Sequence, residues 1–167
     1  PLLIYMVGRA RPRNVRKADQ IPVVSILISA YNEENYIGKT IENKLDLDYP
    51  TDKLEILVTS DGSTDRTQDI VEQYIRSAGP DRVGLLVQLP RQGKTAALNA
   101  AVTRAKGDIL VFSDANSLYA REALKKLVRN FSDPDVGYVT GKMVYGNPDG
   151  TLIGEGCSAY MRYENFL

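Results

Sequence analysis

Asp114 and Asn116 stand one residue apart directly after "ILVFS", an apolar run at residues 109–113. A carboxylate and a carboxamide both offer oxygen ligands, which hard cations such as Mg²⁺ and Mn²⁺ prefer. The same pair also suits an ordinary turn, because Asp and Asn bond their own backbone there. A metal and diphosphate site and a plain turn are therefore both open for this segment.

Composition removes several classes of chemistry. The sequence has no histidine, which excludes Ser-His-Asp and Cys-His catalysis and any zinc site with histidine ligands. The single Cys157 excludes an intramolecular disulfide and indicates a reducing compartment. Basic and acidic residues number 21 each, and no basic stripe runs through the body of the chain, so no nucleic-acid partner is expected.

Polar segments also follow two earlier apolar runs. The first, "SAYNEEN", contains Tyr31 and Glu33, which suit a stacking contact with a nucleobase and a polar anchor. Acids there equally suit the start of a helix. The second, "SDGSTD", contains Asp61, whose carboxylate suits a nucleobase N–H or a ribose hydroxyl. Ser63 or Thr64 of the same segment is expected to cap the next helix.

A fourth polar segment, "PRQGKT", carries two cations. Arg91 and Lys94 stand at the expected start of a helix, which predicts an anion-binding corner. The segment resembles the end of a P-loop, but Gln88 occupies the position where that motif needs glycine. We therefore reject the P-loop and keep the phosphate contact.

Strands and helices alternate along the sequence from residue 22 onward. This pattern predicts right-handed βαβ units and a mostly parallel α/β sheet with helices on both faces. Ligands of such sheets bind at the carboxyl ends of the strands, so the four polar segments should meet there as a nucleotide-diphosphate site. Expected strands are 23–29, 54–60, 82–89, 108–113 and 136–145, and expected helices are 35–46, 64–77, 94–106, 118–131 and 158–167.

Two other nucleotide-binding classes carry glycine-rich loops after the first strand. A Rossmann dinucleotide domain needs G-x-G-x-x-G there, and a sugar-nucleotide nucleotidyltransferase also has a glycine-rich loop at this position. The segment "SAYNEE" contains no glycine, which argues against both. A non-catalytic nucleotide-binding module remains an alternative to an enzyme.

The motifs together resemble a known family. "VSILISAYNEENYIGKTIENKL", "EILVTSDGSTDRT" and "RQGKTAALNAAVTRAKGDILVFSDANS", in this order, resemble family 2 glycosyltransferases with the GT-A fold, over about residues 22–145. "YMRYENFL" resembles the segment that leads into the acceptor half of membrane-associated, processive-like members. The resemblance implies inverting transfer of a sugar from a nucleotide-diphosphate sugar, commonly a UDP-sugar, to a polysaccharide or lipid acceptor.

The resemblance also implies roles for individual residues. Tyr31 and Glu33 would contact the base and its surroundings, and Asp61 would hold the uracil or ribose edge. Lys94, with Arg91 nearby, would lie by the nucleotide or its diphosphate.

The family's D-x-D motif corresponds to Asp114 and Asn116, which would coordinate Mg²⁺ or Mn²⁺ on the diphosphate. Asn116 replaces the second acid and brings no charge, so we expect weaker metal binding but not its loss. Two more departures occur at Ala30, where many members have Pro or Thr, and at Ser60, which replaces the first acid of Asp-Asp-Gly-Ser.

No catalytic base is assigned, because the family's base lies in a later acceptor-side motif. The late acids Glu155 and Glu164 match no such motif. We therefore expect a donor-binding half that is truncated before the acceptor half and binds nucleotide without efficient sugar transfer.

Two regions are expected along the chain. Residues 1–21 form a basic arm, in which apolar "PLLIYMV" precedes the Arg9–Lys17 cluster. This arm is either a frayed end or the stub of a transmembrane helix, since basic residues follow the cytoplasmic ends of such helices. Residues 22–167 form the incomplete nucleotide-sugar-binding domain. The expected location is the cytoplasmic face of a membrane, contacted through segments outside this chain, or the cytoplasm.

Overall fold

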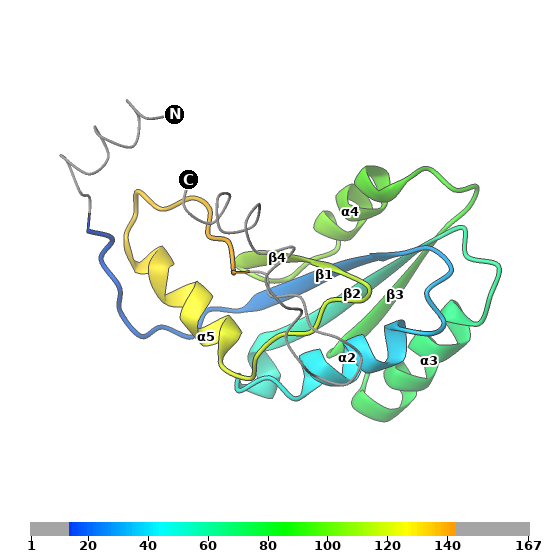
Figure 1. Ribbon diagram of the computed structural model, residues 1–167, viewed down its shortest axis with the longest axis horizontal. Helices are drawn as coiled ribbons and strands as arrows, with labels where there is room; N and C mark the ends of the chain where they lie inside the picture. The colour runs from blue at the N-terminus through cyan, green and yellow to red at the C-terminus, as the bar shows by residue number, and fades with distance from the viewer. Residues whose placement is uncertain (1–13, 143–167) are drawn as a thin grey trace, which may run out of the picture.

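Four parallel strands form the sheet in the computed structural model, which describes residues 14–142. The strand order is β3-β2-β1-β4, and every neighbouring pair is parallel (Figure 1). This confirms the predicted α/β class. The elements are β1 Val24–Ala30, α2 Ile37–Leu45, η1 Thr51–Lys53, β2 Leu54–Asp61, α3 Thr67–Ala78, β3 Val83–Gln88, α4 Lys94–Val102, β4 Ile109–Asp114, α5 Ala123–Val128 and η2 Arg129–Ser132.

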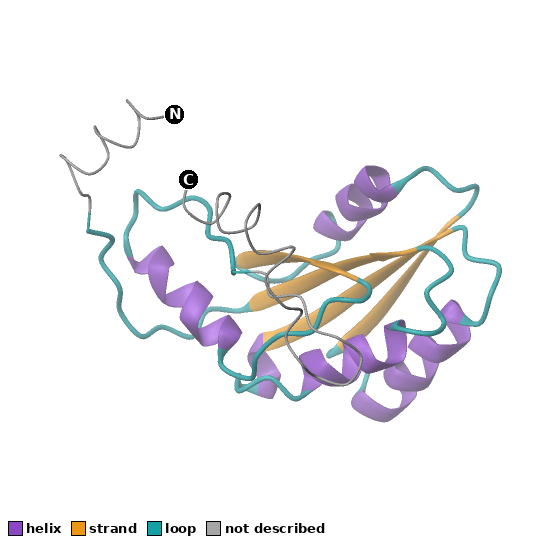
Figure 2. Cartoon of the chain, viewed as in Figure 1, coloured by secondary structure: helices purple, strands orange, loops and turns teal. Residues whose placement is uncertain are grey.

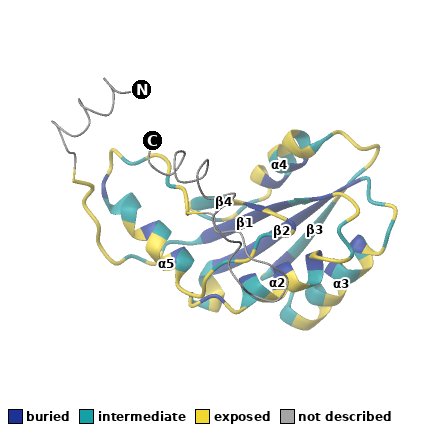
Figure 3. Cartoon of the chain, in the orientation of Figure 1, coloured by how far each residue is buried: buried dark blue, intermediate teal, exposed yellow. Residues whose placement is uncertain are grey.

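Helices cover both faces of this sheet, with α4 on one side and α2, α3 and α5 on the other (Figure 2). Along β1, Ile26 and Ile28 belong to the larger core under α2 and α3, whereas Leu27 packs with Ala101 of α4. The two central strands, β1 and β2, are buried along almost their whole length, as expected for strands covered on both faces (Figure 3).

Ile37, Ile41 and Leu45 recur every four residues along the first helix and form its apolar stripe. Ile37 and Ile41 are fully buried, and Leu45 packs partly buried against the same core. A spacing of four residues places these side chains on one face of α2. That face lies against the sheet and fixes the helix directly after the first strand end.

Gly107 directly follows the predicted helix 94–106, but it does not end a helix in the structure. α4 ends at Val102, well before this glycine. The Gly107 N–H donates to Ser25 Oγ at 2.7 Å, and a Cβ at this position would lie 2.4 Å from the Ser25 nitrogen. The α4–β4 connection therefore requires glycine for its close approach to β1.

The helix predicted at residues 118–131 is shorter in the structure. α5 begins at Ala123, and η2 follows it. Residues 115–119 form a loop because their backbone groups bond side chains of α2 and not one another. The predicted boundary is therefore wrong by several residues at its start.

The fifth predicted strand, 136–145, is not a strand over residues 136–142. Its Val, Tyr and Thr residues favour a strand, but Tyr138 is 79% exposed and no described strand pairs with this segment. Residues 143–145 of this prediction, the helix at 158–167 and the acids Glu155 and Glu164 lie outside the described residues, as does Cys157.

The described part of the N-terminal arm packs beside α5 and η2. The Arg16 N–H donates to Asp133 Oδ2 at 3.2 Å, and Gln20 Nε2 donates to the Val128 carbonyl at 2.7 Å. Over residues 14–142, the structure has no helix with the length and apolar character needed to cross a bilayer. Residues 1–13 of the arm lie outside the described residues.

Candidate functional site

A cleft of about 400 Å³ lies at the carboxyl ends of the parallel strands. It contains all seven residues that the sequence predicts for the site, together with Ser29 and Ala115, which the sequence reasoning missed. Ser29 belongs to a continuous buried-strand pattern, which carries no signal of function. The lining residues are Ser29, Tyr31, Glu33, Asp61, Arg91, Lys94, Asp114, Ala115 and Asn116.

Asp61, the last residue of β2, is held by the loop that follows β3. Its carboxylate is 3% exposed and accepts hydrogen bonds from the Gln92 and Gly93 N–H groups, both at 2.8 Å. Gln88 Nε2 donates a third bond at 3.0 Å. The carboxylate therefore shapes the loop that carries Arg91, a role that the sequence did not predict. Its contact with a nucleotide stays a prediction.

Arg91 connects Tyr31 to Asp61. The guanidinium carbon lies 3.7 Å from the centroid of the Tyr31 ring, in cation–π geometry. Arg91 Nε also lies 3.8 Å from Asp61 Oδ2. Gly62 permits this packing, because it has a φ of +74° and a Cβ there would lie 2.9 Å from Arg91 Cβ. One cation and one aromatic ring thus lie together in the cleft.

Lys94 and Asp114 form an ion pair on another wall of the cleft. Lys94 is the first residue of α4 and Asp114 the last of β4, and Nζ lies 2.5 Å from Oδ1. Both side chains are at least half exposed. A lysine in the first turn opposes the helix dipole, but there it gathers positive charge with the helix N–H groups, which suits an anion.

Asp114 and Asn116 together offer an incomplete ligand set for a cation. Among residues 14–142, no three His, Cys, Asp or Glu side chains gather in a way that could hold a metal. One carboxylate and one carboxamide nevertheless fit a hard cation that takes its remaining ligands from water and a diphosphate, as Mg²⁺ does in phosphate-binding sites.

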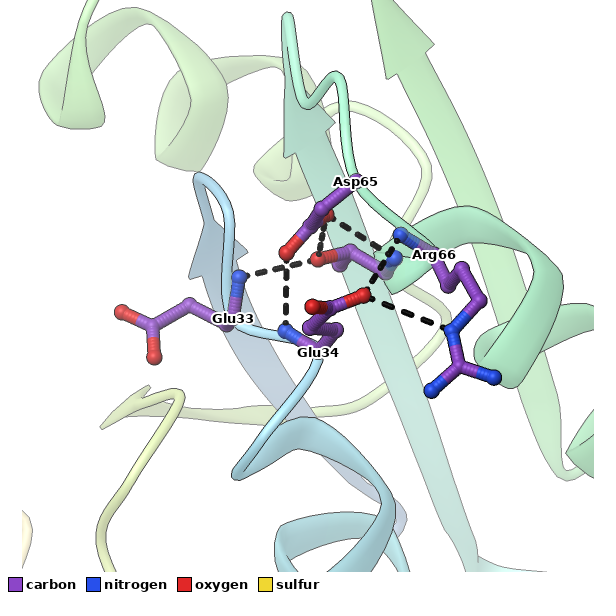
Figure 4. Close-up of polar contacts among 5 residues, drawn as sticks. Glu33, Glu34, Asp65 and Arg66 are labelled. Atoms are coloured by element: carbon purple, nitrogen blue, oxygen red, sulfur yellow. Dashed lines mark hydrogen bonds and ion pairs between the residues drawn. The ribbon is translucent and has the colours of Figure 1, made fainter.

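The loops after β1 and β2 are joined by reciprocal hydrogen bonds (Figure 4). Asp65 Oδ2 accepts from the Glu34 N–H and Glu34 Oε2 accepts from the Arg66 N–H, both at 3.1 Å. The Glu33 N–H donates to Thr67 Oγ1 at 2.8 Å, while the Glu33 side chain points away from the cluster. The carboxylate of Glu33 is thus kept out of the loop contacts and lines the cleft.

Asp65, the residue before the N-cap Arg66, bonds the start of α3 in place of Ser63 or Thr64, which the sequence predicts as the cap. Its Oδ1 accepts from the Thr67 N–H at 3.0 Å, where α3 begins. Burial would raise the pKa of this carboxyl, but hydrogen bonds from the Thr67 hydroxyl, the Thr67 N–H and the Glu34 N–H outweigh it and lower the pKa. The capping prediction is therefore wrong, because the N-cap of α3 is Arg66.

Ser63 and Thr64 instead bond Asn32 across the two loops. The Asn32 N–H donates to Ser63 Oγ at 3.2 Å, and Asn32 Oδ1 accepts from the Thr64 N–H at 2.8 Å. Asn32 has a φ of +54°, which Asn tolerates better than most residues. The alternative role of Glu33 and Glu34 at the start of a helix stays a prediction: both acids precede α2, whose first turn contains no acid.

The chain is similar to known glycosyltransferases. A family model described as Glycosyl transferase family 2 matches residues 25–164. The chain is 36% identical over 138 residues to the probable glycosyltransferase YdaM of Bacillus subtilis, covering 80% of this chain and 32% of that protein. It is 33% identical over 140 residues to the beta-monoglucosyldiacylglycerol synthase of Nostoc sp., covering 83% of this chain and 30% of that protein.

A solved structure is also similar. The mannosyltransferase PcManGT from Pyrobaculum calidifontis, in complex with GDP-Man and Mn²⁺, has a TM-score of 0.74 and 34% identity to this chain. The similarity covers 89% of this chain and 44% of that one. The chain thus spans less than half the length of each of these three proteins.

Proposed function

The chain belongs to glycosyl transferase family 2 and has the GT-A fold, and from this premise we propose that its cleft binds the nucleotide-diphosphate part of a sugar donor for inverting glycosyl transfer. One observation carries the proposal: all seven predicted side chains converge in one cleft of about 400 Å³. The cleft combines an aromatic ring, two cations and a pair of oxygen ligands, which matches the parts of such a donor.

Each part of the donor has a matching group in this arrangement. The nucleobase stacks beside Tyr31, close to Asp61, and Glu33 borders the same space. Arg91 and Lys94 bring positive charge to the diphosphate, which charge-assisted hydrogen bonds favour.

Asp114 and Asn116 would hold Mg²⁺ or Mn²⁺. When bound, such an ion offsets the negative charge that develops on the leaving diphosphate. The similarity to a mannosyltransferase whose complex contains Mn²⁺ supports this assignment.

We propose a UDP-sugar as the donor, with a GDP-sugar as the alternative, because the similar mannosyltransferase is in complex with GDP-Man. The proposed acceptor is a lipid or a growing polysaccharide at the cytoplasmic face of a membrane. The similarity to a beta-monoglucosyldiacylglycerol synthase supports a lipid acceptor. The basic cluster Arg9–Lys17 supports a location beside anionic lipid. We propose that the membrane contact itself is made by segments outside this chain, as in processive-like members of the family.

Calorimetric titration of the full chain with UDP, GDP and NAD, each with and without Mn²⁺, tests the proposal. We expect UDP or GDP to bind more tightly with Mn²⁺ and Asp114→Ala to abolish that gain. Asp52→Ala, at an exposed acid of η1, is the matched control and should keep it. Binding of NAD alone would overturn the proposal. Metal-dependent nucleotide binding without turnover of any sugar donor would instead support the alternative of a non-catalytic module.

A further inference from the structure

The loop that follows β4 is attached to α2 by side-chain hydrogen bonds to its backbone. Thr40 Oγ1 donates to the Ala115 carbonyl at 2.6 Å. Asn43 bonds Tyr119 twice, since its Nδ2 donates to the Tyr119 carbonyl at 3.0 Å and its Oδ1 accepts from the Tyr119 N–H at 2.7 Å. Two positions of the loop, four residues apart, are thereby fixed to successive turns of one helix.

Lys44 supplies the contact between these two. Its side chain is fully buried, and Nζ donates to the Ser117 carbonyl at 2.5 Å and to Asn43 Oδ1 at 3.2 Å. Nζ also lies 3.6 Å from the centroid of the Tyr119 ring. Over the described part of the chain, no carboxylate pairs with this ammonium group.

A buried ammonium group without a counter-ion is costly. Burial lowers the pKa of Lys44 to about 8, which reflects that cost. An apolar side chain of similar length would fill the same space more favourably. Lysine adds the hydrogen bond to the Ser117 carbonyl and the cation–π contact with Tyr119, and through these two contacts its ammonium group holds the loop.

The anchored carbonyls lie on either side of Asn116. Ala115 and Ser117 are its chain neighbours, and the Ser117 N–H also donates to the Asp114 carbonyl at 3.2 Å. Ala115 is 4% exposed, whereas Asn116 is exposed and lines the cleft. The bonds to α2 therefore fix the backbone of the loop while leaving the carboxamide free to face the cleft.

We propose that Thr40, Asn43 and Lys44 are positioning residues that hold Asp114 and Asn116 in the geometry for binding a divalent cation. The inference rests on the proposed function, because it assigns these residues to the same metal site. A site with one carboxylate and one neutral ligand gains little from charge, so its affinity depends strongly on ligands that are already in place.

The test measures Mn²⁺ binding to the UDP-saturated full chain from the electron paramagnetic resonance signal of free Mn²⁺. Thr40→Val removes the bond to Ala115 with almost no change in shape, and Lys44→Met removes the bond to Ser117. We expect both variants to bind Mn²⁺ roughly 10- to 100-fold more weakly, as loss of residues that orient metal ligands usually does. Thr40→Ser restores the hydroxyl and should restore the affinity.

The matched control is Tyr49→Phe, which removes a hydrogen bond of 2.6 Å from the buried Tyr49 hydroxyl to the Pro22 carbonyl. This bond stabilises the same core but does not touch the 115–119 loop. Tyr49→Phe should lower the melting temperature about as much as Thr40→Val while leaving Mn²⁺ affinity unchanged. UDP affinity without Mn²⁺ should be the same in all four variants.

Hydrogen exchange at the amides of residues 115–119 gives a second readout, and it should quicken in Thr40→Val and Lys44→Met only. Wild-type Mn²⁺ affinity in these two variants overturns the inference and leaves the proposed function standing. An equal loss in Tyr49→Phe overturns it as well, because the effect would then be one of general stability. If the wild type binds no Mn²⁺, or if Asp114→Ala leaves its Mn²⁺ binding unchanged, the proposed metal site and this inference are overturned together.

Discussion

Lys94 Nζ lies 2.5 Å from Asp114 Oδ1, so the cation proposed to contact the diphosphate is paired with the carboxylate proposed to bind the metal. The two groups neutralise each other across the α4–β4 side of the cleft. Both are largely exposed, and such a pair adds little to stability. When a diphosphate and a metal bind together, Lys94 pairs with the diphosphate and Asp114 with the metal, so two attractions replace one. This predicts that nucleotide and metal binding reinforce each other.

Replacement of Lys94 by Met separates these two effects. Without the ammonium group, Asp114 is no longer neutralised, and Mn²⁺ alone should bind up to about fivefold more tightly, the equivalent of an exposed ion pair worth about 1 kcal/mol. UDP should bind at least tenfold more weakly, because hydrogen bonds to charged groups contribute about 1.5–3 kcal/mol. Calorimetry with each ligand alone measures both changes, and a fall in the affinity for Mn²⁺ alone would contradict the competition.

Asp61→Asn tests whether Asp61 shapes the loop after β3. An amide cannot accept on both sides, so the N–H of Gln92 or of Gly93, each in a partly buried hydrogen bond, loses its partner. The free energy of unfolding should fall by about 1 kcal/mol, the typical net contribution of one hydrogen bond. Urea denaturation measures it, with Asp52→Asn as the exposed control, expected within about 0.5 kcal/mol of wild type. Equal stability of both variants would show that the loop does not depend on Asp61.

Gly62→Ala should weaken nucleotide binding beyond its effect on stability. The new Cβ would lie 2.9 Å from Arg91 Cβ and displace that side chain from Tyr31. Gly79→Ala is the matched control, because Gly79 also has a positive φ, +95°, but has nothing within 4 Å of an added Cβ.

Both glycine variants should lose about 1–2 kcal/mol of stability through backbone strain. Only Gly62→Ala should also lose UDP affinity, measured on the folded protein by calorimetry. A similar loss in Gly79→Ala would place the effect in the backbone strain and not in the contact with Arg91.

Lys44 predicts a specific dependence of stability on pH. Burial lowers its pKa to about 8, so between pH 8 and its unfolded value of 10.5 the unfolded chain binds a proton that the folded chain has lost. The unfolding free energy of the wild type should therefore rise relative to Lys44→Met as pH increases through this window. Below pH 8 the difference should be constant.

Urea denaturation of wild type and Lys44→Met at pH 7.0 and 9.5, values chosen on either side of about pH 8, checks this expectation. Taking the difference between the two proteins cancels the titration of groups that they share, including Tyr119, whose pKa is raised by burial. An unchanged difference between the two pH values would show that Lys44 keeps its ordinary pKa in the folded chain.

Much of the fold follows from patterns that are local in the sequence. The continuous apolar run of β1 predicts a strand covered on both faces, and Ile37, Ile41 and Leu45 predict the buried face of α2. Parallel topology then brings the strand ends together, which is why Asp61 and the other predicted residues share one cleft.

The partner of each polar side chain was decided by the tertiary structure alone. The local sequence around Asp61 is the same whether its carboxylate faces a nucleotide or bonds Gln92 and Gly93, which lie 31 and 32 residues away. In the sequence, Lys44 is indistinguishable from the other polar residues of its helix. Only in the folded chain does the loop after β4 cover it, through Ser117, 73 residues further on. Periodicity records which face of an element is buried, because burial repeats along the chain. Hydrogen-bond partners depend on which loops meet, and that is a property of the assembled sheet and helices.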